Sequence, residues 1–255
     1  MTLLLTPVPN FPLVNAGDDL AGIIVHSVNS SDLHPKDGDI WILAQKIVSK
    51  AENRLVNINR IIPSARAFEI ANKTKKDPRF VELVLSESSK VLRASPGTLI
   101  VEHHCGFICA NAGIDHSNVM SDEGNPDDWF LLLPENPDAS AYRIRCDLEE
   151  AYKCRFGVLI IDSHGRAWRN GTVGITIGLS GLPGVVDLRG RPDMFGYRLQ
   201  ITQIGAADEL AAAASLVMGQ ADEGKPVVLA RGFPYALRDG KLDEILRPEE
   251  NDLFR

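Results

Sequence analysis

The heptapeptide FGVLIID, Phe156 to Asp162, is an unbroken apolar run that closes on a carboxylate. A short run of this kind, rich in Val, Ile and Leu, is typical of a strand buried on both faces. Strand patterns recur in GDIWILAQKIVSKAENR (38–54), GTVGITIGLSG (171–181) and PVVLARG (226–232), and ADELAAAASLVM (207–218) has a helical pattern. Strands and helices alternate without an internal repeat or a break in composition. The sequence therefore predicts a mixed α/β (α+β) fold in one domain, residues 1–255.

Three further helices are expected: one opened by Pro63 and running through Ala67, Ile70 and Ala71, and two at 78–92 and 139–153. PRFVELVLSESSKVL places Phe80, Leu83 and Val84 on one face, and ASAYRIRCDLEEAYK places Ile144, Leu148, Ala151 and Tyr152 in a buried stripe. Asp138 is the expected N-cap of the third helix, because a short oxygen side chain satisfies N–H groups of the first turn.

The charge and the cysteine content exclude several classes of protein. Lys and Arg number 27 against 34 Asp and Glu, which gives a net charge of −7 and argues against non-specific nucleic-acid binding. The apolar start MTLLLTPVPNFPLV lacks the basic segment of a secretory signal, and no apolar run approaches the roughly 18 residues of a spanning helix. The 4 cysteines are too few for a disulfide scaffold. We expect a cytoplasmic protein that binds neither nucleic acid nor membranes.

GQADEGKP, Gly219 to Pro226, resembles a phosphate-binding P-loop except that Pro226 replaces the hydroxyl residue. A P-loop joins a strand to a helix N-terminus, where N–H groups and the positive dipole end face the phosphates. Here a helix pattern precedes the loop and a strand pattern follows it. The order predicts a helix C-cap at Gly219 instead of a Walker motif.

CANAGIDHSNV, Cys109 to Val119, gathers Asp115, His116, Ser117 and Asn118 after two small residues and a glycine. Hard oxygen groups of this kind suit Mg²⁺ or Mn²⁺ better than Zn²⁺. An Asx-type turn, in which the polar side chains bond their own backbone, explains the same residues.

LIIDSHGRAWRNG, Leu159 to Gly171, puts Asp162 where a buried strand is expected to end. Carboxylates at that position often hold metals or phosphates in α/β proteins. Ser163 offers a further oxygen, and Arg166 and Arg169 are suited to anions. A strand-to-turn transition with a solvated basic loop is the alternative.

Several long segments resemble, in order, those of the coenzyme F420-0:L-glutamate ligase family. They are NAGIDHSNV, LLLPENPDASA, IIDSHGRAWRNG, IGLSGL, DLRGRPDMFGYRL, ADELAAAASLVMG and KPVVLARG, preceded by PNFPLVNAGDDLAGII and GDIWILAQKIVSKAENR. The similarity runs from about Pro7 to Gly232. It implies a non-Rossmann fold of two intertwined α/β subdomains and a homodimer.

The activity that the resemblance implies is GTP-dependent formation of an amide bond. L-Glutamate joins the lactyl phosphate carboxylate of the deazaflavin coenzyme F420-0 through an acyl phosphate, and further γ-linked glutamates can follow. Two divalent cations, Mn²⁺ or Mg²⁺, would assist, and K⁺ is an additional candidate.

The resemblance also implies roles for individual residues. Asp115 and Asp162 would hold the first metal, and Ser163 and Gln220 the second. The nucleotide would contact Phe11, Pro12, Leu13, Val14, Gln45, Lys46, Lys50, Asn118, Met218, Gly219, Gln220, Ala221, Asp222, Glu223, Gly224 and Lys225. Asp115, Asp162, Arg169 and His116 are the catalytic candidates, with His116 either contacting substrate or shaping the turn.

The chain departs from the family pattern at a few positions. Gln220 stands where an acidic residue is common, Ser163 replaces the usual Thr, and Lys46 replaces a small hydroxyl residue. SDEGNPDDW, Ser121 to Trp129, lengthens one connection. Two alternatives therefore stand beside the leading one: a related ligase with a different acid or amino-acid substrate, and a non-catalytic GTP-binding paralogue.

Overall fold

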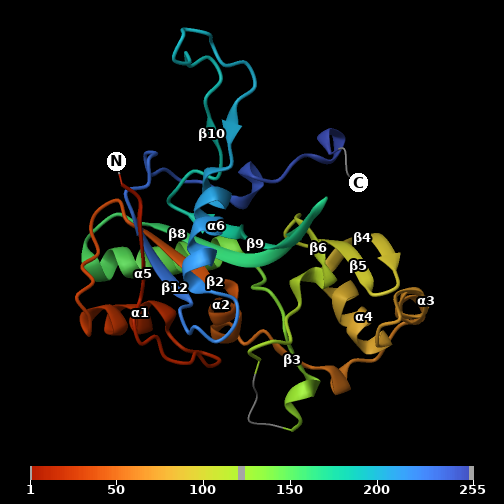
Figure 1. Cartoon of the computed structure of the whole chain (residues 1–255). Helices are drawn as coiled ribbons and strands as arrows, with labels where there is room; N and C mark the ends of the chain where they lie inside the picture. Colours follow the sequence, from red (N-terminus) through yellow and green to blue (C-terminus); the bar gives the residue numbers. More distant parts are fainter. Residues whose placement is uncertain (1, 120–123, 253–255) are drawn as a thin grey trace.

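The computed structural model describes residues 2–119 and 124–252. The first three residues of the segment Ser121 to Trp129 therefore lie outside the described residues. The chain forms a larger part around a five-stranded sheet and a smaller part around a three-stranded sheet (Figure 1).

The larger sheet mixes strand directions. Its order is β1 (Leu4–Pro7), β12 (Val227–Arg231), β2 (Ile40–Ala44), β8 (Gly157–Arg166) and β9 (Arg169–Ser180). β2 and β8 run parallel, whereas each other neighbouring pair is antiparallel. The predicted apolar strands are confirmed, and all but the last residue of β12 and of β2 are buried. The predicted mixed α/β class is confirmed.

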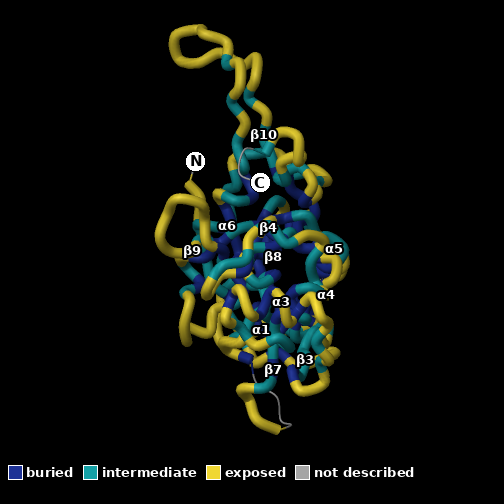
Figure 2. The backbone as a smooth tube through the Cα atoms, turned by 90° about the vertical axis from the view of Figure 1, so that its right-hand side faces the viewer, coloured by how far each residue is buried: buried dark blue, intermediate teal, exposed yellow. Residues whose placement is uncertain are grey.

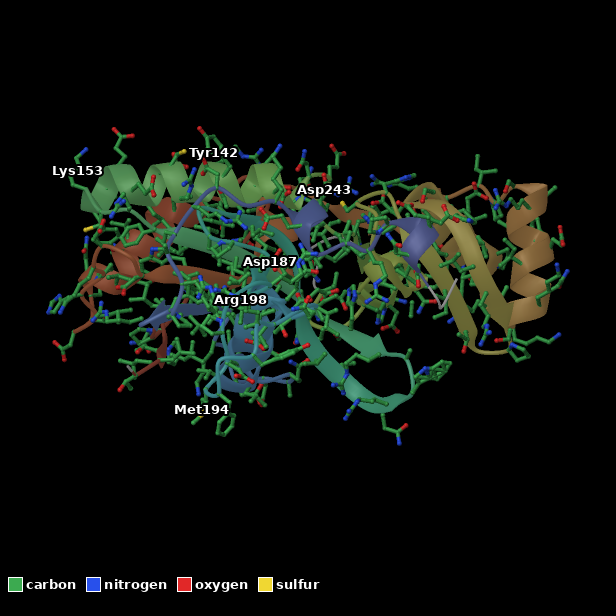
Figure 3. All side chains as sticks on the ribbon, turned by 90° about the horizontal axis from the view of Figure 1, so that it is seen from above. Tyr142, Lys153, Asp187, Met194, Arg198 and Asp243 are labelled. Carbon is green, nitrogen blue, oxygen red and sulfur yellow. The ribbon has the colours of Figure 1, made fainter. Side chains whose placement is uncertain are left out.

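Two helices cover opposite faces of this sheet. A register shift in the β8–β9 pair separates Gly174 from Gly178, so that the two glycines face opposite sides. A Cβ at Gly174 would meet Ala211 and Ser215 of α6 (Ala206–Met218), and one at Gly178 would meet the start of α5 (Pro137–Tyr152). Figure 3 shows α5 along one side of the sheet, with Tyr142 and Lys153 pointing away from it. α1 (Leu20–Asn29) packs beside α5.

The start of α5 differs from the prediction. The N-cap is Asn136, whose side chain accepts a hydrogen bond from the Ala139 N–H. The carboxylate of Asp138 instead accepts hydrogen bonds from the backbone N–H groups of Leu179 (2.8 Å) and Leu242 (3.0 Å). Asp138 therefore links α5 to β9 and to the C-terminal segment. It is not needed as the N-cap, because Asn136 caps the helix and Pro137 occupies its first turn.

The buried stripe of α5 is shorter than predicted. Ile144 and Leu148 are buried, but Ala151 is exposed and Tyr152 is half-buried. Tyr152 stacks on the buried Trp41 of β2 with ring centroids 6.2 Å apart. The helix therefore contributes its aromatic end to the core.

The smaller part has its own hydrophobic cluster. α3 (Ala65–Thr74) and α4 (Pro78–Ser86) pack against the antiparallel sheet of β4 (Ser88–Ser95), β5 (Thr98–His103) and β6 (Ile108–Ala110). The helix predicted for 78–92 ends at Ser86. The residues from Ser88 pair with β5, which overrides their helical spacing.

A two-stranded arm projects from the larger part (Figures 1 and 2). β10 (Val186–Asp187) pairs with β11 (Gln203–Ile204), and Figure 2 shows the connection between them as largely exposed. At its end the side chains of Met194 and Phe195 are 94% and 93% exposed. Within residues 2–119 and 124–252, no helix is both long and apolar enough to cross a membrane.

Candidate active site

The site forms where three connections reach one edge of the larger sheet. β2 ends at Ala44, and α2 (Gln45–Ala51) follows directly. Ala44 pairs with Ile161 of the parallel strand β8, so the residues that follow them, Gln45 and Asp162, are also neighbours. The Ala44 N–H donates to the Pro226 carbonyl at 2.8 Å, which brings in the loop before β12.

The loop Gly219–Pro226 has the predicted helix-to-strand order. It follows α6, with Gly219 as the C-cap at a φ of 78°, and leads into β12. This loop reaches the same edge as α2 without forming a Walker motif.

Asp115 arrives at this edge from the smaller part of the molecule. The preceding residues Asn111, Ala112 and Gly113 have φ values of 52°, 55° and 66°, a left-handed run that favours small or flexible residues. Asp115 then forms two backbone hydrogen bonds with Leu131 (2.9 and 2.8 Å), which lies in β7 (Trp129–Leu131) beside β3 (Leu55–Asn57). The expected tight backbone is confirmed.

The Asp115 carboxylate is held by side chains of α2. Gln45 Nε2 donates to Asp115 Oδ2 at 2.5 Å, and Ser49 Oγ donates to Gln45 Oε1 at 2.8 Å. Gln45 is only 1% exposed, and its buried amide bonds Asp115 through the nitrogen and Ser49 through the oxygen. Asp115 accepts from another element instead of from its own turn, which disfavours the simple Asx-turn interpretation.

Asp162 lies close enough to Asp115 for their charges to interact. Burial, followed by the negative charge of Asp162, raises the pKa of Asp115 to about 6, although Lys46 and Gln45 oppose the shift. Asp162 Oδ2 lies 2.8 Å from Nε2 of His164. The fold thus brings together two carboxylates that are far apart in the sequence.

Asp162 does not end its strand, contrary to the prediction. β8 continues to Arg166 and turns into β9, so Asp162 lies within a long hairpin. His164 was not predicted. The sequence feature that could have indicated His164 is its spacing of two residues from Asp162, because residues two apart in a strand have side chains on the same face.

Two lysines of α2, Lys46 and Lys50, are the cations on the helix that holds the Asp115 carboxylate. Lys46 Nζ is 3.6 Å from Asp115 Oδ2 and donates to Ser117 Oγ at 2.8 Å. Lys50 lies one turn further along α2, where burial and the charge of Lys46 lower its pKa. Both lysines lie on α2, which directly follows β2.

Arg166 and Arg169 are paired at the turn of the β8–β9 hairpin, and both are exposed. Arg166 Nη2 donates to the Asn170 carbonyl at 3.4 Å. At about 3.3 Å per residue, the Cα of Arg166 is roughly 13 Å along the strand from that of Asp162. The structure therefore places the predicted catalytic Arg169 at the outer end of the hairpin, apart from the carboxylates.

A second set of oxygen groups connects β8 with the Gly219–Pro226 loop. Ser163 Oγ donates to Gln220 Oε1 at 2.8 Å, and Gln220 Nε2 donates to Ser215 Oγ at 3.0 Å. Asn118 Nδ2 donates to the Ala221 carbonyl at 3.2 Å. The predicted second-metal pair, Ser163 and Gln220, is therefore in contact.

The rest of that loop is exposed and partly held by Glu223. The Glu223 carboxylate accepts from the Ala221 N–H at 2.8 Å, and this bond contributes most to lowering the pKa of Glu223. Asp222, Gly224 and Lys225 are exposed, whereas Met218 is buried. The exposed backbone and side chains remain accessible to a ligand.

The predicted N-terminal contact segment starts at the same edge. Val8 donates its N–H to the Val227 carbonyl at 2.9 Å, so the chain leaves β1 beside the start of β12. Pro12 and Leu13 are exposed, Phe11 is half-buried and Val14 is buried in the core. Pro12 and Leu13 are the members of this segment that face solvent.

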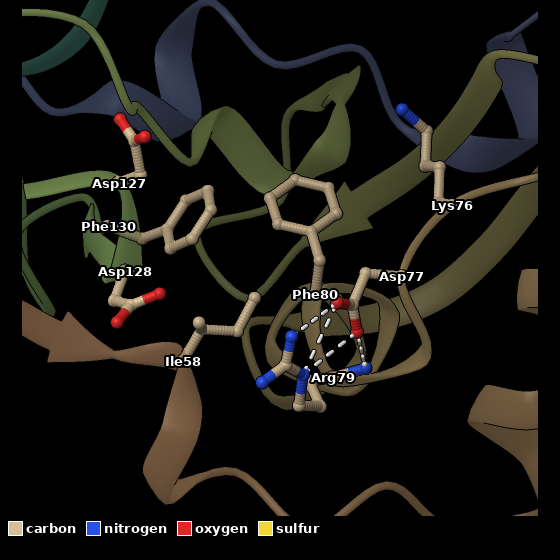
Figure 4. Close-up of a pocket in the computed structure, with 8 residues that line it drawn as sticks. All are labelled: Ile58, Lys76, Asp77, Arg79, Phe80, Asp127, Asp128 and Phe130. Carbon is tan, nitrogen blue, oxygen red and sulfur yellow. Dashed lines mark hydrogen bonds and ion pairs between the residues drawn. The ribbon is translucent and has the colours of Figure 1, made fainter. Parts of the chain in front are cut away.

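His116 points away from the metal candidates. Its Nε2 lies 3.2 Å from the Asp127 carbonyl, and its ring lies 5.0 Å from that of Phe130. Beyond Phe130 is a pocket between α4 and the chain that leads into β7 (Figure 4). Neither Phe130 nor the facing Phe80 was predicted as a site residue.

The donor set at the edge fits a hard divalent cation. Asp115 with Asp162 and, on the opposite face of β8, Ser163 with Gln220 supply oxygen ligands, the type that Mg²⁺ and Mn²⁺ prefer. Across the described residues, no group of three or more His, Cys, Asp and Glu side chains is placed to hold a metal. A metal here would therefore depend on two carboxylates together with neutral oxygens and ligand atoms.

Comparison with known proteins identifies the family to which the chain is similar. The family model described as F420-0:Gamma-glutamyl ligase matches residues 10–232. A protein of Methanothermobacter thermautotrophicus named coenzyme F420:L-glutamate ligase is 46% identical over 100% of both chains. Proteins of the same name from Methanocaldococcus jannaschii (43%, 86% of each chain) and Archaeoglobus fulgidus (42%, 98% of this chain and 95% of the other) are also similar.

Proposed function

We propose that this chain, which belongs to the F420-0:gamma-glutamyl ligase family, is a GTP-dependent ligase that joins L-glutamate to coenzyme F420-0. The new amide bond would link the glutamate nitrogen to the lactyl phosphate carboxylate of the acceptor. The observation that carries the proposal is the convergence of Asp115 and Asp162 at one sheet edge, next to Lys46 and Lys50.

The reaction needs an activated carboxylate, because a free carboxylate is a poor acyl donor. An oxygen of the acceptor carboxylate attacks the γ-phosphorus of GTP, the bond to the β-phosphate oxygen breaks, and GDP leaves. The amine of glutamate then attacks the acyl carbon, inorganic phosphate departs with the C–O bond electrons, and the nitrogen loses a proton.

The chain's own residues fit these steps. Asp115 and Asp162 would hold one divalent cation, Mn²⁺ or Mg²⁺, and Ser163 with Gln220 would contribute to a second. Bound divalent cations neutralise charge on phosphoryl groups as it moves to the leaving group. Gln45 fixes the orientation of Asp115. Potassium is a further candidate cation for this site.

Lysines on α2 are suited to the nucleotide phosphates. Lys46 and Lys50 lie one helical turn apart, so their side chains share a face. Burial and the neighbouring cation lower the pKa of Lys50, a cost that an anionic ligand would offset. The exposed parts of Gly219–Pro226 and Pro12 with Leu13 lie at the same edge and would complete the nucleotide contacts.

We also propose a homodimer in the cytoplasm. Met194 and Phe195, at the end of the arm, are almost fully exposed, and the arm projects from the larger part (Figure 1). Apolar groups gathered on a projection are typical of protein contact surfaces. A second copy would bury them.

Mass spectrometry of the deazaflavin product tests the activity. Purified protein is incubated with F420-0, L-glutamate, GTP and Mn²⁺, and each component is omitted in turn. A glutamate-sized gain that needs every component is expected, and larger gains would count γ-linked additions. GTP binding without any gain would instead favour another acid acceptor or a non-catalytic paralogue.

A further inference from the structure

A pocket of about 370 Å³ lies beside His116, on the side of the site that faces the smaller part of the molecule (Figure 4). Its walls come from α4 with the residues before it, from β7 with the residues before it, and from the single turn that follows β3. The lining residues are Ile58, Lys76, Asp77, Arg79, Phe80, Asp127, Asp128 and Phe130.

Two aromatic rings form the apolar walls. The ring centroids of Phe80 and Phe130 are 5.3 Å apart and inclined by 48°, and both side chains are half-buried. Figure 4 shows the two rings pointing into the same space above Ile58. The two rings pack against one another and together form an aromatic surface that lines the pocket.

The pocket lies close to the carboxylate site, on the other side of the chain segment that carries Asp115. Phe130 lies 5.0 Å from the His116 ring, and His116 directly follows Asp115 in the chain. Phe130 also precedes Leu131, the backbone partner of Asp115. A long molecule with one end on Phe80 would have to pass the exposed His116 to reach Asp115.

The polar rim carries both signs of charge. Arg79 is held by Asp77 (2.7 Å) and by Asn59 Oδ1 (2.7 Å), and Asn59 also donates to Asp128 (2.7 Å). Lys76 Nζ lies 5.6 Å from the centre of the Phe80 ring. Carboxylates on this rim disfavour phosphates, but they accept hydrogen bonds from ring N–H groups, while Lys76 can donate to ring carbonyls.

We propose that this pocket binds the planar deazaflavin ring of the acceptor, so that its phosphate-linked tail reaches Asp115 and Asp162. The inference rests on the proposed function and adds to it a ring subsite. A conjugated heterocycle with an N–H and carbonyl edge matches two aromatic walls and a rim of mixed charge. The nucleotide would then occupy the opposite side, where Asn118 contacts the Gly219–Pro226 loop.

Binding of the fluorescent deazaflavin tests the subsite directly. Phe80→Leu keeps apolar volume against the core but removes the aromatic face, and Phe80→Ala removes both. Phe68→Ala, an exposed phenylalanine of α3, is the matched control. A planar ring stacks more favourably on an aromatic face than on an aliphatic side chain, so we expect Phe80→Leu to weaken acceptor binding about tenfold, or about 1.4 kcal/mol.

The kinetic readouts separate the subsite from general damage. Phe80→Leu should raise the KM for F420-0 about tenfold and leave the KM values for GTP and glutamate within twofold of the parent protein. The deazaflavin lacking its phosphate tail should compete with F420-0 on the parent protein and lose that competition on Phe80→Leu. Phe68→Ala should match the parent protein throughout.

The possible failures are distinct. If the parent protein binds and glutamylates F420-0 but both Phe80 variants do so with unchanged affinity, the subsite is wrong and the proposed function stands. If the parent protein neither binds nor glutamylates F420-0, the proposed function is wrong and the subsite falls with it.

Discussion

Asp115→Asn should stabilise the metal-free protein while it abolishes metal-dependent turnover. Burial and the nearby charge of Asp162 raise the pKa of Asp115 from its ordinary 3.8 to about 6. The folded chain therefore holds this proton more tightly than the unfolded chain. The ionised carboxylate costs stability above about pH 6, and that cost fades as the pH falls towards 4.

The size of the effect follows from the pKa. One pKa unit corresponds to about 1.4 kcal/mol, so the raised value is worth up to about 3 kcal/mol at pH 8. The pKa of about 6 already includes the opposing attraction of Lys46, but the Asp115 side chain is 26% exposed, so solvent screens part of the cost. Allowing for this exposure, we expect a gain of about 1–2 kcal/mol in the free energy of unfolding. Asparagine keeps an oxygen that can accept from Gln45.

Urea unfolding in EDTA at pH 8 and pH 5 measures this gain, with Asp147→Asn on the exposed face of α5 as the control. The advantage of Asp115→Asn should be largest at pH 8 and shrink at pH 5. Added Mn²⁺ should stabilise the parent protein but not the variant, because only the parent keeps both carboxylates. A variant less stable than the parent at pH 8 would refute the electrostatic reasoning, and full turnover would refute the metal-ligand role.

Three further predictions concern the fold, the second metal and the arm. Asp39→Asn should lower the free energy of unfolding by about 3 kcal/mol, because Asp39 is 2% exposed and pairs with Arg231 at 2.6 Å; urea titration at pH 7 checks this, and a change below the fitting error contradicts it. Gln220→Glu keeps the oxygen that accepts from Ser163 and adds a charge, so the Mn²⁺ concentration for half-maximal activity should fall about tenfold; an unchanged concentration removes Gln220 from the second-metal set. Phe195→Ser should shift the protein from dimer to monomer in light scattering at micromolar concentration. A variant that remains a dimer would show that the end of the arm is not the dimer contact.

Local patterns in the sequence were enough to predict most of the larger sheet. The apolar strands, the helix that ends at Gly219 and the tight backbone before Asp115 each follow from short-range chemistry. The helix predicted for 78–92 failed because the residues after Ser86 have an ambiguous period, and pairing of Ser88–Ser95 with β5 decides their structure. Asp138 fits an N-cap locally, but Leu179 and Leu242, distant in sequence, take its hydrogen-bonding capacity.

The site itself depends on long-range geometry. No local pattern shows that Asp115 and Asp162 meet, because their proximity arises where the β2–β8 pair and the chain leaving the smaller part reach one edge. The same holds for Ser163 and Gln220, which come from a strand and from the loop after a helix. Arg166 and Arg169 show the converse: they are close to Asp162 in sequence, yet the hairpin carries them away from it.

The two carboxylates are held by different hydrophobic clusters, which explains how the chain tolerates their repulsion. Asp162 lies in β8, whose apolar residues belong to the core of the larger sheet, whereas Asp115 follows Ala112, a member of the smaller cluster. Each carboxylate is fixed by the packing of its own strand or turn, so moving the two apart would cost packing free energy in one of the clusters. The left-handed run at Asn111–Gly113 adds backbone strain to the same approach. The free energy of folding thus outweighs the repulsion between Asp115 and Asp162 before any cation binds. A divalent cation that binds there is attracted by both carboxylates, and none of its binding free energy is needed to bring them together.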